Sequence, residues 1–137
     1  MSAPAGLPHR DAVLAALRGA GLVVGDGVAP VRAERPASGA FAVLYASPGR
    51  ATRESLADER TDWHGLMQVT CVGPSPERAL WVADRVAAAL HGPLAVAGRV
   101  AWRPEVDADP PPVQRDDDES PPLFHVPLQF TLRSTTA

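Results

Sequence analysis

Residues 69–90 read VTCVGPSPERALWVADRVAAAL, which is an apolar strand, a proline-containing turn and an amphipathic helix in direct succession. Ser75 is placed to cap the helix, because its side-chain oxygen can accept a hydrogen bond from the first turn. Pro76 suits the first helical position, and Gly92 with Pro93 ends the helix. Apolar residues at helical spacing predict the stripe that packs on a sheet: Ala79, Leu80, Ala83, Val86, Ala87 and Leu90.

The sheet beneath this helix is predicted from alternating apolar residues on either side of it in the chain. Residues 63–73 and 123–134 alternate over their whole lengths, and Pro127 marks an edge or a bulge because it has no N–H. Further strands are predicted over 28–34, 40–47 and 98–106, and a first helix over 8–20. This order predicts one α+β domain over residues 1–137, with an antiparallel-dominated sheet of four to five strands and two helices packed on one face.

Composition limits the class of protein. The chain has 137 residues, of which 45% are hydrophobic, enough for one core and too many for a disordered chain. Apolar runs fall short of the roughly 18–20 residues of a membrane span, and the N-terminus lacks the pattern of a signal peptide, so we expect no membrane contact and no secretion. The single cysteine, Cys71, excludes an internal disulfide, and its apolar strand predicts a buried, inert thiol.

Two long polar connections, over residues 48–62 and 107–122, are expected to protrude. The first carries Arg50, Arg53 and Arg60, and the second carries a run of four acids at residues 116–119. The net charge is −3, with +2 over residues 1–103 and −5 over residues 104–137, so there is no basic excess for binding phosphates. The acidic run, Asp116, Asp117, Asp118 and Glu119, lacks the spaced ligands of a calcium loop and favours a solvated loop.

Residues that could carry catalysis are sparse. The histidines His9, His64, His91 and His125 form no metal-binding or catalytic spacing, and we expect them at the surface or at strand ends. The sequence has no phosphate-binding glycine loop, no GxSxG and no Rossmann pattern. We therefore predict no catalytic, cofactor-binding or metal-binding residues and no cofactor, and a small enzyme is the weakest of the functions considered.

Trp81 is the strongest candidate for contact with a partner. The helical period places it opposite the apolar stripe, beside Arg78 and Arg85. Tryptophan and arginine are the residues most enriched at interface hot spots, although a neighbouring loop or terminus could instead cover this ring. We predict these three residues as a subunit or partner interface. Arg50, Arg53 and Arg60 are candidates for contacts with the carboxylates of a partner or with DNA phosphates.

The strand, turn and helix of residues 69–90, with the acid- and proline-rich loop and the closing segment PLFHVPLQFTLRST (122–135), resemble the tail terminator proteins of long-tailed, siphovirus-type phages and prophages of actinobacteria. The absence of Lys, Asn and Ile fits the GC-rich coding of such hosts. The resemblance covers roughly residues 8–135 and rests on element order and apolar pattern. The acidic run at 116–119 departs from it.

This resemblance implies a structural virion protein rather than an enzyme. Such proteins form a hexameric ring at the head-proximal end of the tail tube, end tube polymerisation and provide the head-tail joining surface. The implied partners are other copies of the chain, the major tail tube protein and a head-completion or neck protein, and DNA passes through the lumen without sequence-specific binding. Assembly would occur in the host cytoplasm. The alternatives are another small neck or tail-completion protein, or a soluble adaptor or ligand-binding module of a GC-rich bacterium.

Overall fold

The computed structural model describes residues 5–52 and 61–137 and confirms the α+β class. The described part contains two α-helices, one short 3-10 helix and eight strands. In chain order these are α1 (Gly6–Gly19), β1 (Val24–Asp26), η1 (Arg32–Glu34), β2 (Phe41–Ala46), β3 (Arg50–Thr52), β4 (Asp62–Gly73), α2 (Pro76–Ala89), β5 (Arg99–Ala101), β6 (Glu105–Val106), β7 (Gln114–Asp116) and β8 (Leu123–Thr136).

The centre of the sheet is the antiparallel pair β4 and β8, which are in register from Asp62 opposite Thr135 to Gly73 opposite Phe124. β2 and β3 follow each other along the other edge of β4, and β1 pairs with β2 in parallel. β5, β6 and β7 follow each other along the outer edge of β8. The described residues form more strands than the predicted four to five, because the strands that flank the central pair are interrupted. Pro48 lies between β2 and β3 and Pro104 lies between β5 and β6, and a proline has no N–H to donate to a neighbouring strand.

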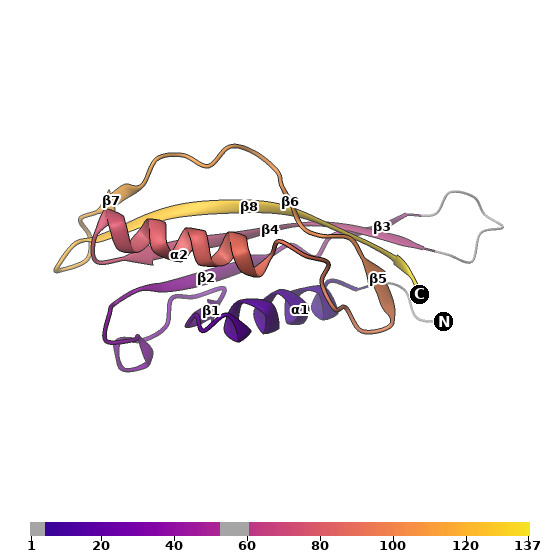
Figure 1. Ribbon diagram of the computed structural model, residues 1–137, viewed down its shortest axis with the longest axis horizontal. Helices are drawn as coiled ribbons and strands as arrows, with labels where there is room; N and C mark the ends of the chain where they lie inside the picture. The colour runs from indigo at the N-terminus through magenta and orange to yellow at the C-terminus, as the bar shows by residue number, and fades with distance from the viewer. Residues whose placement is uncertain (1–4, 53–60) are drawn as a thin grey trace.

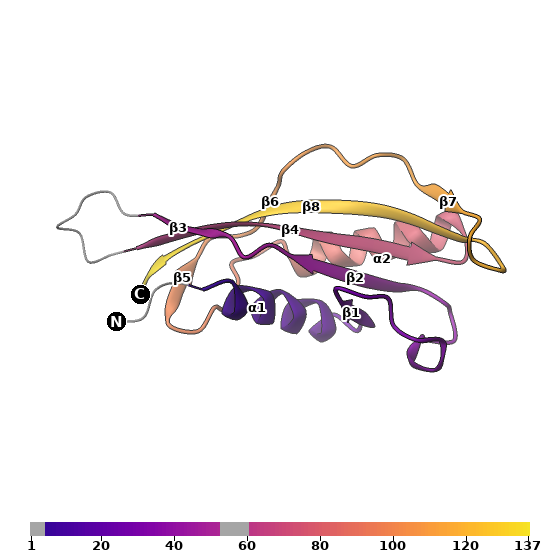
Figure 2. The ribbon, with the colours of Figure 1, turned by 180° about the vertical axis from the view of Figure 1, so that it is seen from behind.

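Both helices cover the same face of the sheet, as predicted (Figure 1). α2 packs on β4 and β8, while α1 contacts α2, β1 and β2. The view from behind shows the sheet in front of α2, and it shows the start of α1 and the C-terminus at the end of the molecule that carries β3 and β5 (Figure 2). The core between the layers combines Leu17 of α1, Val86 of α2, Met67 of β4 and Phe130 of β8, all buried.

The apolar stripe of α2 is rotated from the predicted one. Val82 is buried, whereas Leu80 is 52% exposed and Ala87 is exposed as well. The rotation has a tertiary cause, because α1 packs along the Val82 side of the helix. The Leu80 side faces the connection between β6 and β7, which leaves it open.

The predicted strand over residues 28–34 is wrong. β1 lies earlier, at Val24–Asp26, and residues 32–34 form the 3-10 helix η1. The chain turns at Gly27, whose φ of 73° belongs to the left-handed region that favours glycine. Pro30 then removes an N–H that a strand would need. The valines of this segment, Val28 and Val31, consequently stand exposed instead of alternating in a sheet.

Candidate interaction surfaces

The outward face of α2 brings together the three residues that the sequence predicts as an interface. The indole of Trp81 is 39% exposed, so the described residues leave the ring open. The guanidinium of Arg85 lies 4.9 Å from the centre of that ring and that of Arg78 lies 6.0 Å from it. Ser75 caps the helix by accepting a hydrogen bond from the Arg78 N–H at 3.2 Å, as its position predicts. The result is a flat aromatic surface flanked by cations, which suits a partner with apolar and acidic groups.

An apolar groove of about 300 Å³ runs along the other side of α2. One wall is Leu80, Asp84 and Ala87 of the helix, and the opposite wall is Val106 with Pro110 and Pro111. Its floor is the helix-facing side of β8, from Val126 to Phe130. The sequence misses this groove because its two walls are far apart in the chain.

The outer edge of β8 is unpaired at this groove. β7 pairs with residues 123–125 and β6 with residues 130–131, so the described chain provides no strand opposite residues 126–129. On this edge, the Asp107 N–H donates to the Gln129 carbonyl and the Trp102 N–H donates to the Arg133 carbonyl. In an antiparallel strand every second residue directs its N–H and C=O to the same edge, so Pro127 also faces this one. Pro127 has no N–H, so this residue presents no unsatisfied donor to the gap, which agrees with the edge or bulge that the sequence predicts there.

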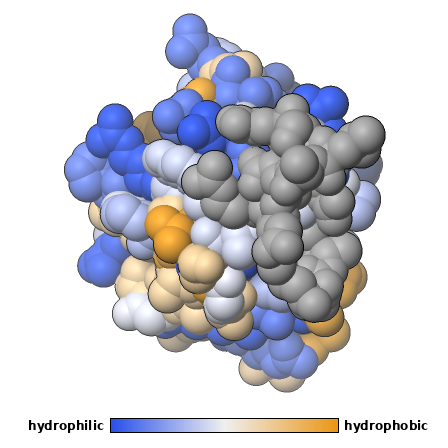
Figure 3. Space-filling model, turned by 90° about the vertical axis from the view of Figure 1, so that its right-hand side faces the viewer, coloured by the Kyte–Doolittle hydropathy of each residue, from blue (hydrophilic) through white to orange (hydrophobic). Residues whose placement is uncertain are grey.

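The sheet face that lies away from the helices carries a second tryptophan–arginine pair. Trp102 is 43% exposed, and the guanidinium of Arg133 lies 4.3 Å from the centre of its ring. Tyr45, Leu66 and Val100 are further exposed apolar residues on this face. Figure 3, which shows the end of the molecule that carries β3 and β5, displays apolar patches among hydrophilic groups on the molecular surface. Trp102 and Arg133 come from separate segments, so neighbouring positions in the sequence do not predict this pair.

Arg50 lies exposed on β3 and lines a shallow hollow of about 390 Å³ together with His64, Asp107 and Thr131. Arg53 and Arg60, which the sequence groups with it, lie outside the described residues. In the second connection, Arg115 pairs with Asp117, and Arg32 lies 3.9 Å from Glu119. The acidic run is thus partly neutralised by exposed arginines, and its loop includes the short strand β7.

His9 is buried, with 1% of its surface exposed, which corrects the expectation of a surface histidine. Its ring stacks on Trp63 with centres 3.8 Å apart. The Arg99 Nε donates to Ser134 Oγ at 2.7 Å. The Ser134 hydroxyl in turn donates to His9 Nε2, also at 2.7 Å, because the proton of the neutral ring is on Nδ1. His9 Nδ1–H then donates to the Ala5 carbonyl at 2.6 Å. Burial is the main cause that lowers the pKa of His9, and nearby Arg99 lowers it further.

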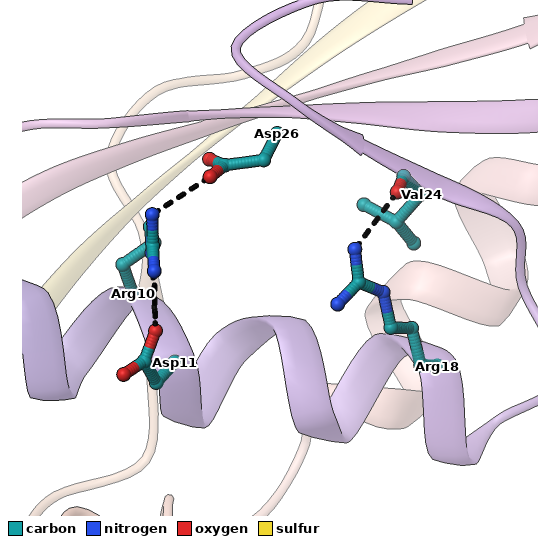
Figure 4. A network of polar contacts seen from close by, with 5 residues as sticks. All are labelled: Arg10, Asp11, Arg18, Val24 and Asp26. Atoms are coloured by element: carbon teal, nitrogen blue, oxygen red, sulfur yellow. Dashed lines mark hydrogen bonds and ion pairs between the residues drawn. The ribbon is translucent and has the colours of Figure 1, made fainter. Parts of the chain in front are cut away.

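This serine–histidine pair is structural. Ser134 is fully buried and its hydroxyl is held by Arg99, so no substrate can reach it. The network joins α1, β5 and the end of β8. A neighbouring set of contacts ties α1 to β1 (Figure 4): Arg10 pairs with Asp26 at 2.7 Å and with Asp11, and Arg18 donates to the Val24 carbonyl.

Metal and thiol chemistry receive no support from the described residues. Within residues 5–52 and 61–137, no group of three or more His, Cys, Asp or Glu side chains is arranged to hold a metal ion. Cys71 is fully buried, as predicted, and burial raises the pKa of its thiol to about 12. None of the described helices combines the length and the apolar character that a bilayer crossing requires.

Comparison with known proteins finds the fold but no family. No protein-family model and no curated protein matches the chain. A chain of the virion of a native gene transfer agent particle is similar in structure, with a TM-score of 0.53 and 21% identity over 93% of this chain and 87% of that one. A second solved structure, whose name states no function, has a TM-score of 0.54 and 20% identity over 94% of this chain and 90% of its own. At these identities the likeness concerns the fold.

Proposed function

We propose that this chain is a structural component of a phage-like particle, and that it acts as a tail terminator. In this role a hexameric ring of the chain caps the head-proximal end of the tail tube, ends its polymerisation and offers a surface for head joining. The observation that carries the proposal is the fold shared with a chain of a gene transfer agent virion along nearly the whole length of both chains. The sequence resemblance to tail terminators supports the same role independently.

The surfaces of the molecule support an assembly role rather than catalysis. A closed ring of identical subunits needs two different patches on each copy that meet head to tail. The chain offers several separate patches with exposed aromatic or branched apolar residues, including Trp81 on α2 and Trp102 on the opposite side of the sheet. In this proposal the other copies of the chain, the tail tube protein and a neck protein cover these patches.

The charge distribution fits a conduit for DNA. A ring through which DNA passes must not bind it tightly, and the chain has a net charge of −3 with no basic excess. Arg50, with Arg53 and Arg60, remains the candidate for contact with the tube or the lumen. Replacing all three by serine is expected to impair capping while leaving the fold intact.

The length of tails in particles made without this chain tests the proposal. In a strain or phage that carries the gene, its deletion is expected to give tubes of uncontrolled length without attached heads, because nothing ends polymerisation. Restoring the gene on a plasmid is the control. Normal tails in the deletion would overturn the proposal, whereas tails of normal length that fail to join heads would favour another neck or tail-completion role.

A further inference from the structure

We propose that a turn at one edge of the sheet inserts into the apolar groove at the opposite edge of a second copy of this chain. The turn comprises residues 27–34 and is called the knob here. The groove is the one between α2 and the connection from β6 to β7. The inference rests on the proposed function in one respect, namely that copies of the chain assemble with one another.

The knob presents apolar side chains to solvent in a fixed conformation. Val28 is 68% exposed and Val31 is 60% exposed, which is unusual for two valines in one short turn. Hydrogen bonds hold the turn at both ends, from Gly27 N–H to the Leu44 carbonyl at 2.7 Å and from Arg35 Nε to the Pro30 carbonyl at 2.9 Å. These hydrogen bonds hold the turn in place, so the two valines stay exposed.

The groove provides a complementary apolar surface. Leu80 is 52% exposed and Val106 is 62% exposed, and both are walls of the same groove. The floor between them is the part of β8 whose outer edge has no paired strand. A branched apolar side chain that enters the groove would bury Leu80 and Val106, which is favourable because it removes apolar surface from water. It would not have to displace a paired strand.

Charge favours the knob as the occupant of this groove. Asp84 is the charged side chain among the described residues that line the groove, and exposed Asp109 adjoins Pro110 on the opposite wall. The connection at residues 105–113 contains three acids and no arginine. The side chain of Arg32, in the knob, is 72% exposed, and its guanidinium donates a hydrogen bond to the Ser120 carbonyl at 3.1 Å and lies 3.9 Å from Glu119. Because both contacts are at the surface, a carboxylate of a second copy can replace Glu119 as the partner of Arg32. A knob seated by its valines would bring Arg32 of one copy toward Asp84 of the next.

The positions of knob and groove give this contact its direction. The knob leaves the sheet beside β1, at one end of the strand order, and the groove lies beside β6 and β7, at the other end. In Figure 1 the knob is the purple turn beyond the left end of β2, and the orange segment above β8 forms the outer wall of the groove. Two different patches at opposite edges join head to tail, and such contacts close into a ring or extend as a chain.

The test uses the full chain and single variants with exposed sites. Val31→Asp places a charge on the knob, and Leu80→Arg places bulk and charge in the groove. Leu7→Asp is the matched control, because Leu7 is 59% exposed on α1 and belongs neither to the knob nor to the groove. Sedimentation velocity over a series of concentrations measures self-association, and thermal melts confirm that each variant folds. We expect the two contact variants to weaken association by about tenfold or more and the control to behave as wild type.

Mixing the two contact variants provides the sharper result. The mixture is measured at a concentration at which the wild type associates and each variant alone is monomeric. An equimolar mixture retains one intact knob and one intact groove, so it should form dimers and nothing larger. A mixture that stays monomeric, or contact variants that assemble as wild type does, would overturn the inference.

A cross-linking measurement covers weak association. Cysteines placed at Val31 and Leu80 of one chain should form disulfide-linked ladders, whereas cysteines at Leu7 and Leu80 should not. Cys71 is fully buried and does not interfere. A wild-type chain that is monomeric at every concentration, together with the absence of ladders, would also overturn the inference. Both results leave the proposed function to its own test, the length of tails in the deletion strain.

Discussion

The two faces of the sheet differ in what covers them. On the helix side, alternate residues of β4 and β8 are buried against α1 and α2, with Met67 fully buried and Phe130 only 4% exposed. On the other side, a small cluster around Phe41 and Val43 is covered, while Tyr45, Leu66 and Trp102 remain exposed. The first face forms the main hydrophobic core of the chain. The second face and the two sheet edges carry exposed apolar side chains that the core does not cover, and such patches are typical of interaction surfaces.

The largest expected effect is a difference in the free energy of unfolding between substitutions on the two faces. Phe130→Ala should lower the free energy of unfolding by about 3–5 kcal/mol, because it removes a buried ring and leaves a cavity. Val100→Ala on the open face should change it by about 0.5 kcal/mol or less. Urea unfolding of both variants measures the difference. Equal midpoints would show that the core does not lie between the sheet and the helices.

A smaller effect should appear in assembly and not in folding. Trp81→Ala should weaken the contact that the Trp81 face makes by about 2 kcal/mol if the ring is a hot spot. The monomer should keep its melting temperature, because the ring is partly exposed and its loss leaves no buried cavity. Light scattering with the wild-type and Trp81→Ala chains measures the change. An unchanged distribution of oligomers, with or without tail tubes present, would remove Trp81 from the interface.

Buried His9, on the helix side of the sheet, is expected to make the stability of the fold depend on pH. The pKa of His9 is lowered in the fold from its ordinary value of 6.5, so the unfolded chain binds a proton more readily than the folded chain. The stability that neutral His9 contributes is therefore complete above pH 6.5 and is lost as the pH falls from there through the folded pKa. Unfolding midpoints measured across this range should decline for the wild type and decline less for His9→Gln. Parallel curves for the two chains would contradict the assigned network.

The smallest effect is expected at the acidic run. Replacement of Asp116, Asp117, Asp118 and Glu119 by serine should change the free energy of unfolding by about 0.5 kcal/mol or less, because the ion pairs there are exposed. The urea midpoint checks this. A variant that unfolds would show that this loop contributes to the core.

The contrast between these regions also explains what the sequence could predict. Ser75, Pro76 and Gly92 locate α2 because caps and stops act over a few residues. Trp81 meets Arg78 and Arg85 for the same reason, since residues three and four apart on a helix are neighbours. These signals are local and can be read without knowledge of the tertiary structure.

What the sequence could not predict depends on distant partners. The knob resembles a strand in composition, but Gly27 and Pro30 prevent pairing, and β1 instead forms where α1 returns the chain to β2. The hydrogen bond between His9 and Ser134 joins residues 125 positions apart, so no spacing indicates it. The rotation of α2 follows from its packing against α1, and that rotation is what exposes Leu80 to the groove.

In the proposed function this chain forms a ring at the head-proximal end of a phage-like tail. Gold labelling of a tagged chain in intact particles, viewed by electron microscopy, tests it most directly. We predict label at a single position on each particle, where the tail meets the head, and none along the tube. Label distributed along the tube, on the head shell, or absent from particles that assemble normally would contradict the claim.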